Sequence, residues 1–425
     1  MKNPLKQLKN YLLLWSTQSL SELGSSMTSY ALVLWLYNNS GSALKTALLT
    51  VCSYAPYVLM SIFAGALSDK WNKKRTMLLC DLFAAMTTVA AFVLIKTEAL
   101  ELWHLYAINA LNGLMNTVQQ PASEVASTQL IPKEYYQKTS GLRSLSRSLN
   151  SLLTPVIATV LFTLGGVTAV IATDLITFAA AFITLLLFIP VPEPDKTSES
   201  RESLLSSVRS GLKWLRDCPV VLKLICFLAG INLIASAYNA ALPAMILSKA
   251  ANGENTLGTV NFFAGAAALA GSLIASFAPA PKNRVRAICL SLFFSMSTEN
   301  FMLAFSDSPA VWCAGAVCGW LFIPYMGANL DVILRSNIPP DMQGRVYSCR
   351  NTLQFFTIPL GYLSGGVLID KVFEPYMSGQ AADSPLTTLF GSGKGSGTAM
   401  LFAVLGVAGV AVCVVFSMLL RKSKD

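Results

Sequence analysis

An acidic side chain lies inside an apolar run near the start of this sequence. The polar residues around it recur at steps of four, three and four, which places them on one face of a helix: Gln18, Glu22, Ser25 and Ser29. A charge in hydrocarbon costs about 2.5 kcal/mol or more, so such a residue normally faces a cavity or a partner. In a partly apolar cleft the ionised form of Glu22 is disfavoured, which suits a group that binds and releases protons. Glu22 is therefore the first candidate for proton coupling, and hydrogen bonding between helices is the structural alternative.

Two later apolar runs carry similar polar stripes at helical spacing, one rich in Asn near residue 112 and one near residue 236. Together with the first stripe and two aromatic residues further on, they supply the candidates for substrate contact: Gln18, Ser25, Asn112, Asn116, Asn232, Tyr238, Asn239, Trp320 and Tyr325. The spacing places each stripe on one face of its helix but does not show that the stripes line a common cleft. A cleft lined by them would be mostly apolar, with amides and without a central Arg or Lys, and would suit amphiphilic, often cationic molecules. Sugars and inorganic anions fit it less well.

Three more acids lie inside apolar runs. Glu299 is about midway along its run and is the second candidate for proton coupling, with a structural role as the alternative. Asp81 and Asp174 lie about one and a half turns inside their runs, and Glu124 and Asp331 lie at the ends of theirs. We interpret these four acids as latch or ion-pair residues with Arg75, Arg143 or Arg350, and proton coupling is the alternative.

The composition indicates that these residues are positioned by membrane-spanning helices. The 425 residues are 54% apolar and 12% charged, with a mean hydropathy of +0.55, which leaves little polar surface for an aqueous exterior. A span needs about 20 apolar residues. Twelve runs meet this requirement, near 11–37, 45–68, 76–96, 102–126, 142–165, 168–189, 219–248, 256–278, 284–305, 309–336, 345–370 and 398–420.

The distribution of cations predicts the orientation. All but five of the 31 Lys and Arg residues fall at the termini and in the loops on the same side as the termini. The positive-inside rule then places both termini in the cytoplasm, for a multi-pass protein of the cytoplasmic membrane. The same distribution explains the net charge of +9 without a nucleic-acid partner.

A polar, Pro-rich stretch at 190–200 divides the chain in two. We predict an N-terminal six-helix bundle at 1–190, a cytoplasmic linker at 191–218 and a C-terminal six-helix bundle at 219–425. Within the linker, Glu202–Arg216 has the spacing of an amphipathic helix. An offset of 207 residues superposes Ile131-Pro132 on Ile338-Pro339 and also matches charged positions on both sides, which indicates a parallel repeat.

The turn between the second and third runs, GALSDKWNKKRTM, resembles the signature loop of the major facilitator superfamily. The resemblance implies an all-α membrane protein of twelve transmembrane helices in two pseudo-symmetric bundles, with a central cleft lined by helices one, four, seven and ten. In that family the loop is a conformational latch, so we expect Asp69 to dock on the start of span eleven in one state only. Charges that only set the topology are the alternative. The expected latch residues are Gly65, Asp69, Lys70, Lys73, Lys74, Arg75, Glu124, Asp331 and Arg345. Asn72 stands where the family has Gly, and Asn is one of the few other residues that tolerate a left-handed conformation in a tight turn.

Further stretches resemble the macrolide-efflux and enterobactin-exporter-like branch of drug:proton antiporters, among them Gln120-Pro-Ala-Ser-Glu124, Gly211–Arg216 and Gln343-Gly-Arg-Val346. The resemblance covers essentially the whole chain. It implies export of amphiphilic small molecules in exchange for protons by alternating access. The antiporter motif of span five departs from the family, because Thr154-Pro155 and Ala158-Thr159 stand where Gly-Pro and a Gly pair are usual. This departure weakens the inference of antiport.

Other functions remain as alternatives. The same architecture could export a siderophore, a lipid or another endogenous metabolite. A membrane enzyme or a non-transporting sensor would need a catalytic cluster, yet the chain has one His and no C-x-x-C pair. We predict no enzyme activity, metal site or cofactor. The Gly-rich segment Gly391–Gly397 lacks the Walker order, so we interpret it as a flexible linker. The internal repeat suggests that a monomer is sufficient.

Overall fold

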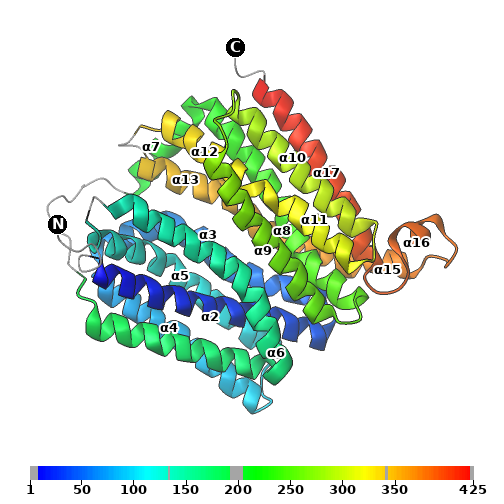
Figure 1. The fold of residues 1–425 in the computed structure, drawn as a ribbon, viewed down its shortest axis with the longest axis horizontal. Coiled ribbons are helices and arrows are strands. Elements are labelled where there is room, and N and C mark those ends of the chain that lie inside the picture. The colour runs from blue at the N-terminus through cyan, green and yellow to red at the C-terminus, as the bar shows by residue number, and fades with distance from the viewer. Residues whose placement is uncertain (1–7, 133–134, 192–203, 340–342, 422–425) are drawn as a thin grey trace. The chain divides into compact units, whose positions relative to one another are not determined.

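The computed structural model describes residues 8–132, 135–191, 204–339 and 343–421 of the chain. Every element in this part is a helix, as expected where backbone groups must pair within their own segment inside hydrocarbon. The helices belong to two compact units, and Figure 1 shows their course. Unit 1 comprises Met1–Leu32 and Cys52–Ser206, and unit 2 comprises Val33–Val51 and Ser207–Asp425.

The first five helices supply unit 1, except for Val33–Val51 at the end of the first helix and the start of the second, which belongs to unit 2. Short connections join them, so successive helices run in opposite directions. They are α2 (Lys9–Ser40), α3 (Ala43–Lys70), α4 (Lys73–Lys96), α5 (Leu102–Gln129) and α6 (Tyr136–Phe188). Within the unit, α4 packs against both α5 and α6.

The long α6 consists of two helices separated by a sharp break. Gly165 and Gly166 have non-helical backbone angles, and Gly166 has φ +66°, a conformation that favours glycine. The predicted spans five and six are the two arms on either side of this break.

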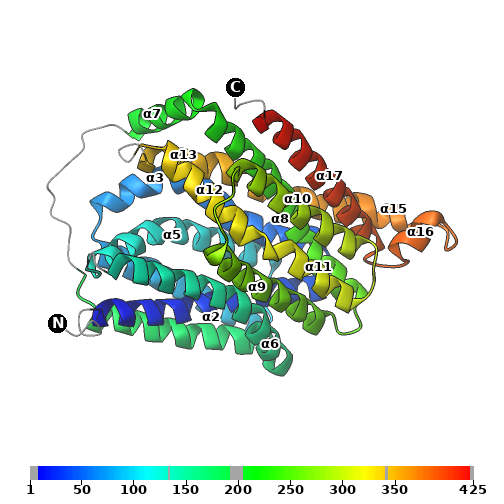
Figure 2. The ribbon, with the colours of Figure 1, turned by 45° about the horizontal axis from the view of Figure 1, so that its top comes forward.

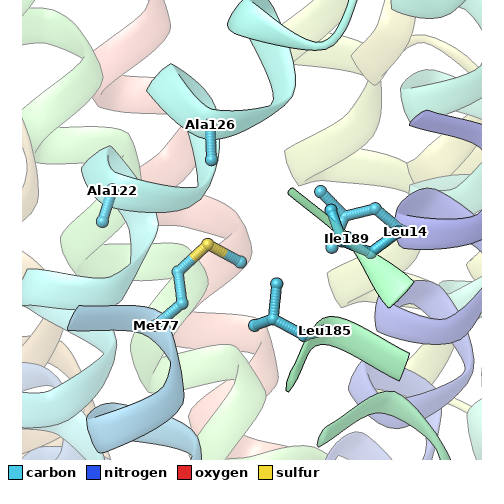
Figure 3. Packing of buried hydrophobic residues seen from close by; sticks show 6 residues of the cluster. All are labelled: Leu14, Met77, Ala122, Ala126, Leu185 and Ile189. Atoms are coloured by element: carbon cyan, nitrogen blue, oxygen red, sulfur yellow. The ribbon is translucent and has the colours of Figure 1, made fainter. Parts of the chain in front are cut away.

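A buried apolar cluster closes one end of unit 1. Figure 3 shows its residues converging from four helices and from the residue that follows α6: Leu14, Met77, Ala122, Ala126, Leu185 and Ile189. Leu14 and Met77 lie in the first turns of α2 and α4, and Ala122 and Ala126 near the end of α5. The cluster therefore lies at the end of the unit where α2 and α4 begin.

The remaining helices supply most of unit 2. They are α7 (Leu204–Asp217), α8 (Pro219–Lys249), α9 (Gly253–Phe277), α10 (Arg284–Ala304), α11 (Pro309–Leu321), α12 (Ile323–Asn337), α13 (Gln343–Phe355), α14 (Thr357–Val367), a π-helix (Leu368–Phe373), α15 (Glu374–Ser378), α16 (Pro385–Phe390) and α17 (Ser396–Arg421). Figures 1 and 2 both show α10 beside α17 and α9 beside α11, pairs that pack closely. The helices that pack most closely against α8 are α14 and α17.

Two predicted spans of unit 2 are interrupted helices. Span ten consists of α11 and α12, with Pro324 in the first turn of α12. Span eleven consists of α13, α14, the π-helix and α15, and Pro359 lies in the first turn of α14. Proline lacks the N–H that would continue the helical bonding, which accounts for breaks at these positions.

Nine segments of the described chain are long and apolar enough to cross a membrane. One of them, Ser146–Phe188, contains both arms of α6. The helices α2 and α5 are not among the nine, and these are the helices that carry the polar stripes near Glu22 and Asn112. Counting α2, α5 and the two arms of α6 accounts for the twelve predicted spans.

The helix α7 lies where the sequence analysis expects an amphipathic linker helix. Leu215 is buried, whereas Arg209, Lys213 and Arg216 are exposed. A Cβ at Gly211 would come within 2.8 Å of the Arg345 carbonyl oxygen, so glycine permits the close packing of α7 on the start of α13.

Candidate functional site

The core of unit 2 encloses a carboxyl group. Glu299 of α10 is only 4% exposed, and the hydroxyl of Tyr238 on α8 donates a hydrogen bond of 2.6 Å to its Oε1. The Trp320 indole lies beside the same carboxyl. On α17, Phe402 makes an edge contact with the Tyr238 ring, at 5.4 Å between centroids. The structure thus brings together residues that the sequence analysis had assigned separately to coupling and to substrate contact.

A glycine makes room for this carboxyl. A Cβ at Gly319 of α11 would come within 2.1 Å of Glu299 Oε2. The next residue, Asn300, is 1% exposed; its Nδ2 donates to the Met296 carbonyl, and its Oδ1 has no partner among the described residues. Sequence analysis missed Asn300 and Gly319, although an amide next to an acid in an apolar run was a usable signal for Asn300.

In unit 1 the polar stripe on α2 is partly exposed. Glu22, Ser25 and Ser29 are exposed, and Gln18 is partly buried. Glu22 therefore lies on the surface of its unit, unlike Glu299.

Asp174 on α6 is buried against α2, the helix that carries this polar stripe. It is 4% exposed and accepts hydrogen bonds from Ser25 (3.1 Å) and Thr28 (2.8 Å), one on each oxygen. On α4, Asp81 accepts from Gln119. The expectation of arginine partners for these two acids was wrong, because the recorded partners are neutral hydroxyl and amide groups.

The predicted amide candidates divide into two kinds. Asn112 accepts a hydrogen bond from Thr87 at 2.8 Å, and Asn232 donates to the Gln354 carbonyl at 3.1 Å, so both connect neighbouring helices. Asn116 and Asn239 are exposed on their units. Tyr325 is partly buried, and its carbonyl accepts from Asn329. The two exposed amides, Asn116 and Asn239, can therefore contact a ligand.

The turn between α3 and α4 differs from expectation at one residue. Asn72 has φ −61° and ψ 118°, an extended conformation, and its side chain accepts from the Arg75 amide. Asn72 does not use the left-handed conformation that asparagine tolerates, because it serves as the N-cap of α4. Lys74 donates to the carbonyls of Leu186 (3.1 Å) and Ile189 (2.8 Å), at the end of α6 where a cation is favourable.

The other expected latch residues are placed as follows. Lys73 is buried and donates to the Trp71 carbonyl, while Arg75 and Asp331 are exposed. Arg345 is partly buried in the first turn of α13. Four members lie outside the residues whose side chains the structure describes: Gly65, Asp69, Lys70 and Glu124. Docking of Asp69 on α13 stays a prediction.

An attachment within unit 2 was not predicted. The carboxylate of Asp370, in the π-helix, accepts from the amides of Ala43 (3.1 Å) and Leu44 (3.0 Å) and from the Ser42 hydroxyl. A Cβ at Gly366 would lie 2.7 Å from Leu44 Cα, so the two backbones are in close contact. This contact holds the start of α3 within unit 2.

The Gly-rich segment before α17 is held in place and was wrongly interpreted as a flexible linker. Glu374 accepts from the amides of Gly395 (3.2 Å) and Thr398 (2.9 Å). Glu374 thus supplies the acceptor for free amides of the first turn of α17. Lys249 also pairs with Asp307 at 2.5 Å nearby and donates to the Phe390 carbonyl.

Comparisons with known proteins agree with this arrangement. A family model described as Major Facilitator Superfamily matches residues 14–362. Macrolide efflux protein A of Streptococcus pyogenes is 22% identical over 374 residues, covering 86% of this chain and 90% of that protein. Enterobactin exporter EntS of Escherichia coli is 26% identical over 291 residues, 66% of each chain. The crystal structure of nucleoside transporter NupG aligns over 97% of this chain and 99% of that chain, with a TM-score of 0.70 at 14% identity. At this identity the structural likeness concerns the fold.

Proposed function

This chain belongs to the major facilitator superfamily of membrane transporters, and on that premise we propose that it exports amphiphilic small molecules in exchange for protons. The observation that carries the proposal is the match to an efflux protein over 90% of that protein's length. Both termini face the cytoplasm in this proposal, because the cations gather on their side of the chain. A monomer is the working unit.

The polar residues support the substrate class. The exposed stripe of α2 offers hydroxyls and one carboxylate, and Asn116 and Asn239 offer amides on exposed faces. A ligand with a large apolar body and a cationic or hydrogen-bonding group matches side chains of these kinds. Glu22 can pair with a cationic substrate or take a proton, which makes the two ligands compete.

Glu299 supports proton coupling in a different way. Its carboxyl is enclosed by Tyr238, Gly319 and Trp320, and no cation is among its recorded partners in the described chain. A buried carboxylate without a counter-ion is costly, so loading it with a proton changes the energy of unit 2. Glu22 and Glu299 are the two proposed coupling carboxyls.

The two units support alternating access. Because Val33–Val51 is packed in unit 2 and the rest of α2 and α3 in unit 1, relative movement must bend these helices or break the Asp370 contacts. We propose that the Asp370 contacts break in one half of the cycle. The turn around Asp69 is the proposed latch at the opposite end of α3.

Proton flux in inverted membrane vesicles tests this function. A dye reports the pH gradient while macrolides, cationic dyes and siderophores are added in turn, with vesicles lacking the protein as the control. The proposal expects one compound class to dissipate the gradient in the presence of the protein only. If every compound leaves the gradient unchanged, proton-coupled drug export is refuted.

Export of a siderophore is the second candidate. It is favoured by the similarity to enterobactin exporter EntS, although that match covers a smaller part of the chain. A siderophore that carries negative charge would need a cationic contact, and the candidate substrate-contact residues include no Lys or Arg. A response to siderophores but not to macrolides or cationic dyes would establish this candidate in place of the first.

A further inference from the structure

A buried carboxyl in unit 1 has one oxygen without a hydrogen-bond donor. Asp81 of α4 is 8% exposed, and Gln119 of α5 donates to its Oδ1. Its Oδ2 is buried and has no partner among the described residues. A buried acceptor that is left without a hydrogen bond costs about 1–3 kcal/mol, and more if the group is charged. Asp174, which is equally buried, differs because both of its oxygens accept a hydroxyl donor.

One polar side chain of α2 lies at the same position. Gln18 is close enough to the Asp81 carboxyl to act as a hydrogen-bond partner, yet its buried Nε2 lies outside hydrogen-bond geometry with any group of the described chain. The buried indole N–H of Trp15, three residues earlier on α2, is likewise unpaired in that part of the chain. Beside Asp81 the structure thus holds an unpaired amide donor as well as an unpaired carboxyl oxygen, both shielded from solvent.

The apolar cluster of Figure 3 lies one turn away from this site. Gln18 follows Leu14 by four residues, and Asp81 follows Met77 by four. On α5, which runs in the opposite direction, Gln119 precedes Ala122 by three. All three polar residues are therefore displaced in the same direction from the apolar cluster, which closes the site at the end where α2 and α4 begin. In the other direction along α2, the next turn carries the exposed Glu22.

The groups facing Asp81 are neutral. The helices that contribute contacts are α2 with Gln18 and α5 with Gln119, and the titratable neighbour on α4 itself is the thiol of Cys80. From α6, which also packs on α4, no charged group of the described chain is a recorded partner. A buried charge requires a counter-ion or neutralisation. A metal cation would need several oxygen ligands, whereas a proton needs one.

The Gln18 amide can hydrogen-bond to the Asp81 carboxyl whether that carboxyl is ionised or protonated. Its NH₂ can donate to an ionised Oδ2, and after a flip of the amide its oxygen can accept from a protonated Oδ2. The switch requires no new residue and little movement.

We propose that Asp81 is the site of an exchangeable proton in unit 1, loaded from the exposed face of α2 through the position of Gln18. A hydronium ion at the exposed stripe gives up a proton and becomes water, Oδ2 accepts the proton, and the carboxylate becomes a neutral acid; release to a water molecule reverses the step. The coupling of this step to export rests on the proposed function, whereas proton binding itself does not.

Infrared spectroscopy of the purified full-length protein in liposomes tests proton binding without any substrate. We expect a carboxylic acid C=O band that titrates with pH in the wild type, disappears in Asp81→Asn and remains in the matched control Asp174→Asn. In Asp81→Glu, which keeps the acid, the band should shift, and in Gln18→Leu its titration should move. A band that is unchanged in Asp81→Asn would overturn the proposal. Loss of the wild-type band on replacing choline by sodium at constant pH would also overturn it, in favour of a sodium site.

Transport by the same variants tests the coupling separately. Since the ratio of protonated to ionised carboxyl changes tenfold per pH unit, the proton occupancy falls by up to about tenfold per unit above the titration midpoint. The wild-type rate should follow this change, and Asp81→Asn should lose this dependence. Retained pH dependence in Asp81→Asn would refute the coupling. If no compound elicits proton flux while the band behaves as expected, the export proposal fails and the proton site stands.

Discussion

Replacement of Tyr238 by Phe removes one hydroxyl from the buried Glu299 pair and keeps the ring that packs on Phe402. The O···O distance of 2.6 Å lies within the range of about 2.5–2.7 Å for a bond to an ionised acceptor. Such a bond contributes about 1.5–3 kcal/mol, and a neutral one about 0.5–1.5 kcal/mol. We therefore expect a coupling energy of about 1.5–3 kcal/mol between the two side chains when Glu299 is ionised.

A double-mutant cycle measures this coupling. The free energy of unfolding in detergent is determined for the wild type, Tyr238→Phe, Glu299→Met, which removes the acceptor, and the double variant at several pH values. Lower pH should reduce the coupling, because protonation of Glu299 replaces a charge-assisted bond by a neutral one. Tyr376→Phe, at an exposed tyrosine, is the control and should be additive with Glu299→Met. A Tyr238–Glu299 coupling below about 0.5 kcal/mol at every pH would refute the hydrogen bond on which the reasoning depends.

Three further perturbations follow from single contacts. Gly319→Ala places a methyl group against Glu299 and should reduce stability by about 1–3 kcal/mol. Adding Glu299→Ala makes room for the methyl group and should restore the stability. If the double variant is no more stable than Gly319→Ala alone, the steric explanation is contradicted. Asp370→Asn weakens the contact with the amides that begin α3 and should speed cleavage of a protease site inserted at Ser42, whereas an unchanged rate would argue against the attachment. Lys74→Met removes the cation from the end of α6 and should lower stability by about 0.3–2 kcal/mol, an effect that must shrink at high salt if the dipole is its cause.

The helices and their amphipathic faces could be predicted from the sequence because they depend on local spacing. The apolar runs required helices in hydrocarbon, and the spacing of Leu215 and Arg216 was sufficient to identify α7. The break at Gly166 also falls where the sequence analysis separated two spans. Each of these features is encoded within one segment of the chain.

The partners of the buried acids could not be predicted in the same way. Tyr238 and Glu299 are 61 residues apart, and their contact depends on how α8 and α10 pack. Arginines were expected for Asp81 because a charge needs compensation, but amides from two other helices lie there instead. Asp370 and the start of α3, which it contacts, are more than 300 residues apart in the sequence, and the residue types involved are common on protein surfaces. The spacing of residues within one segment therefore cannot predict contacts between different segments.

The most direct test of the central claim is substrate movement driven by an imposed pH gradient in liposomes that contain only the purified protein. We expect a macrolide or cationic dye to accumulate against its gradient when the proton gradient favours exchange, and to stop when an ionophore collapses that gradient. Glu299→Gln and Glu22→Gln identify which carboxyl is required. Accumulation that is the same with and without the proton gradient, or that is absent for every compound tested, would contradict the account.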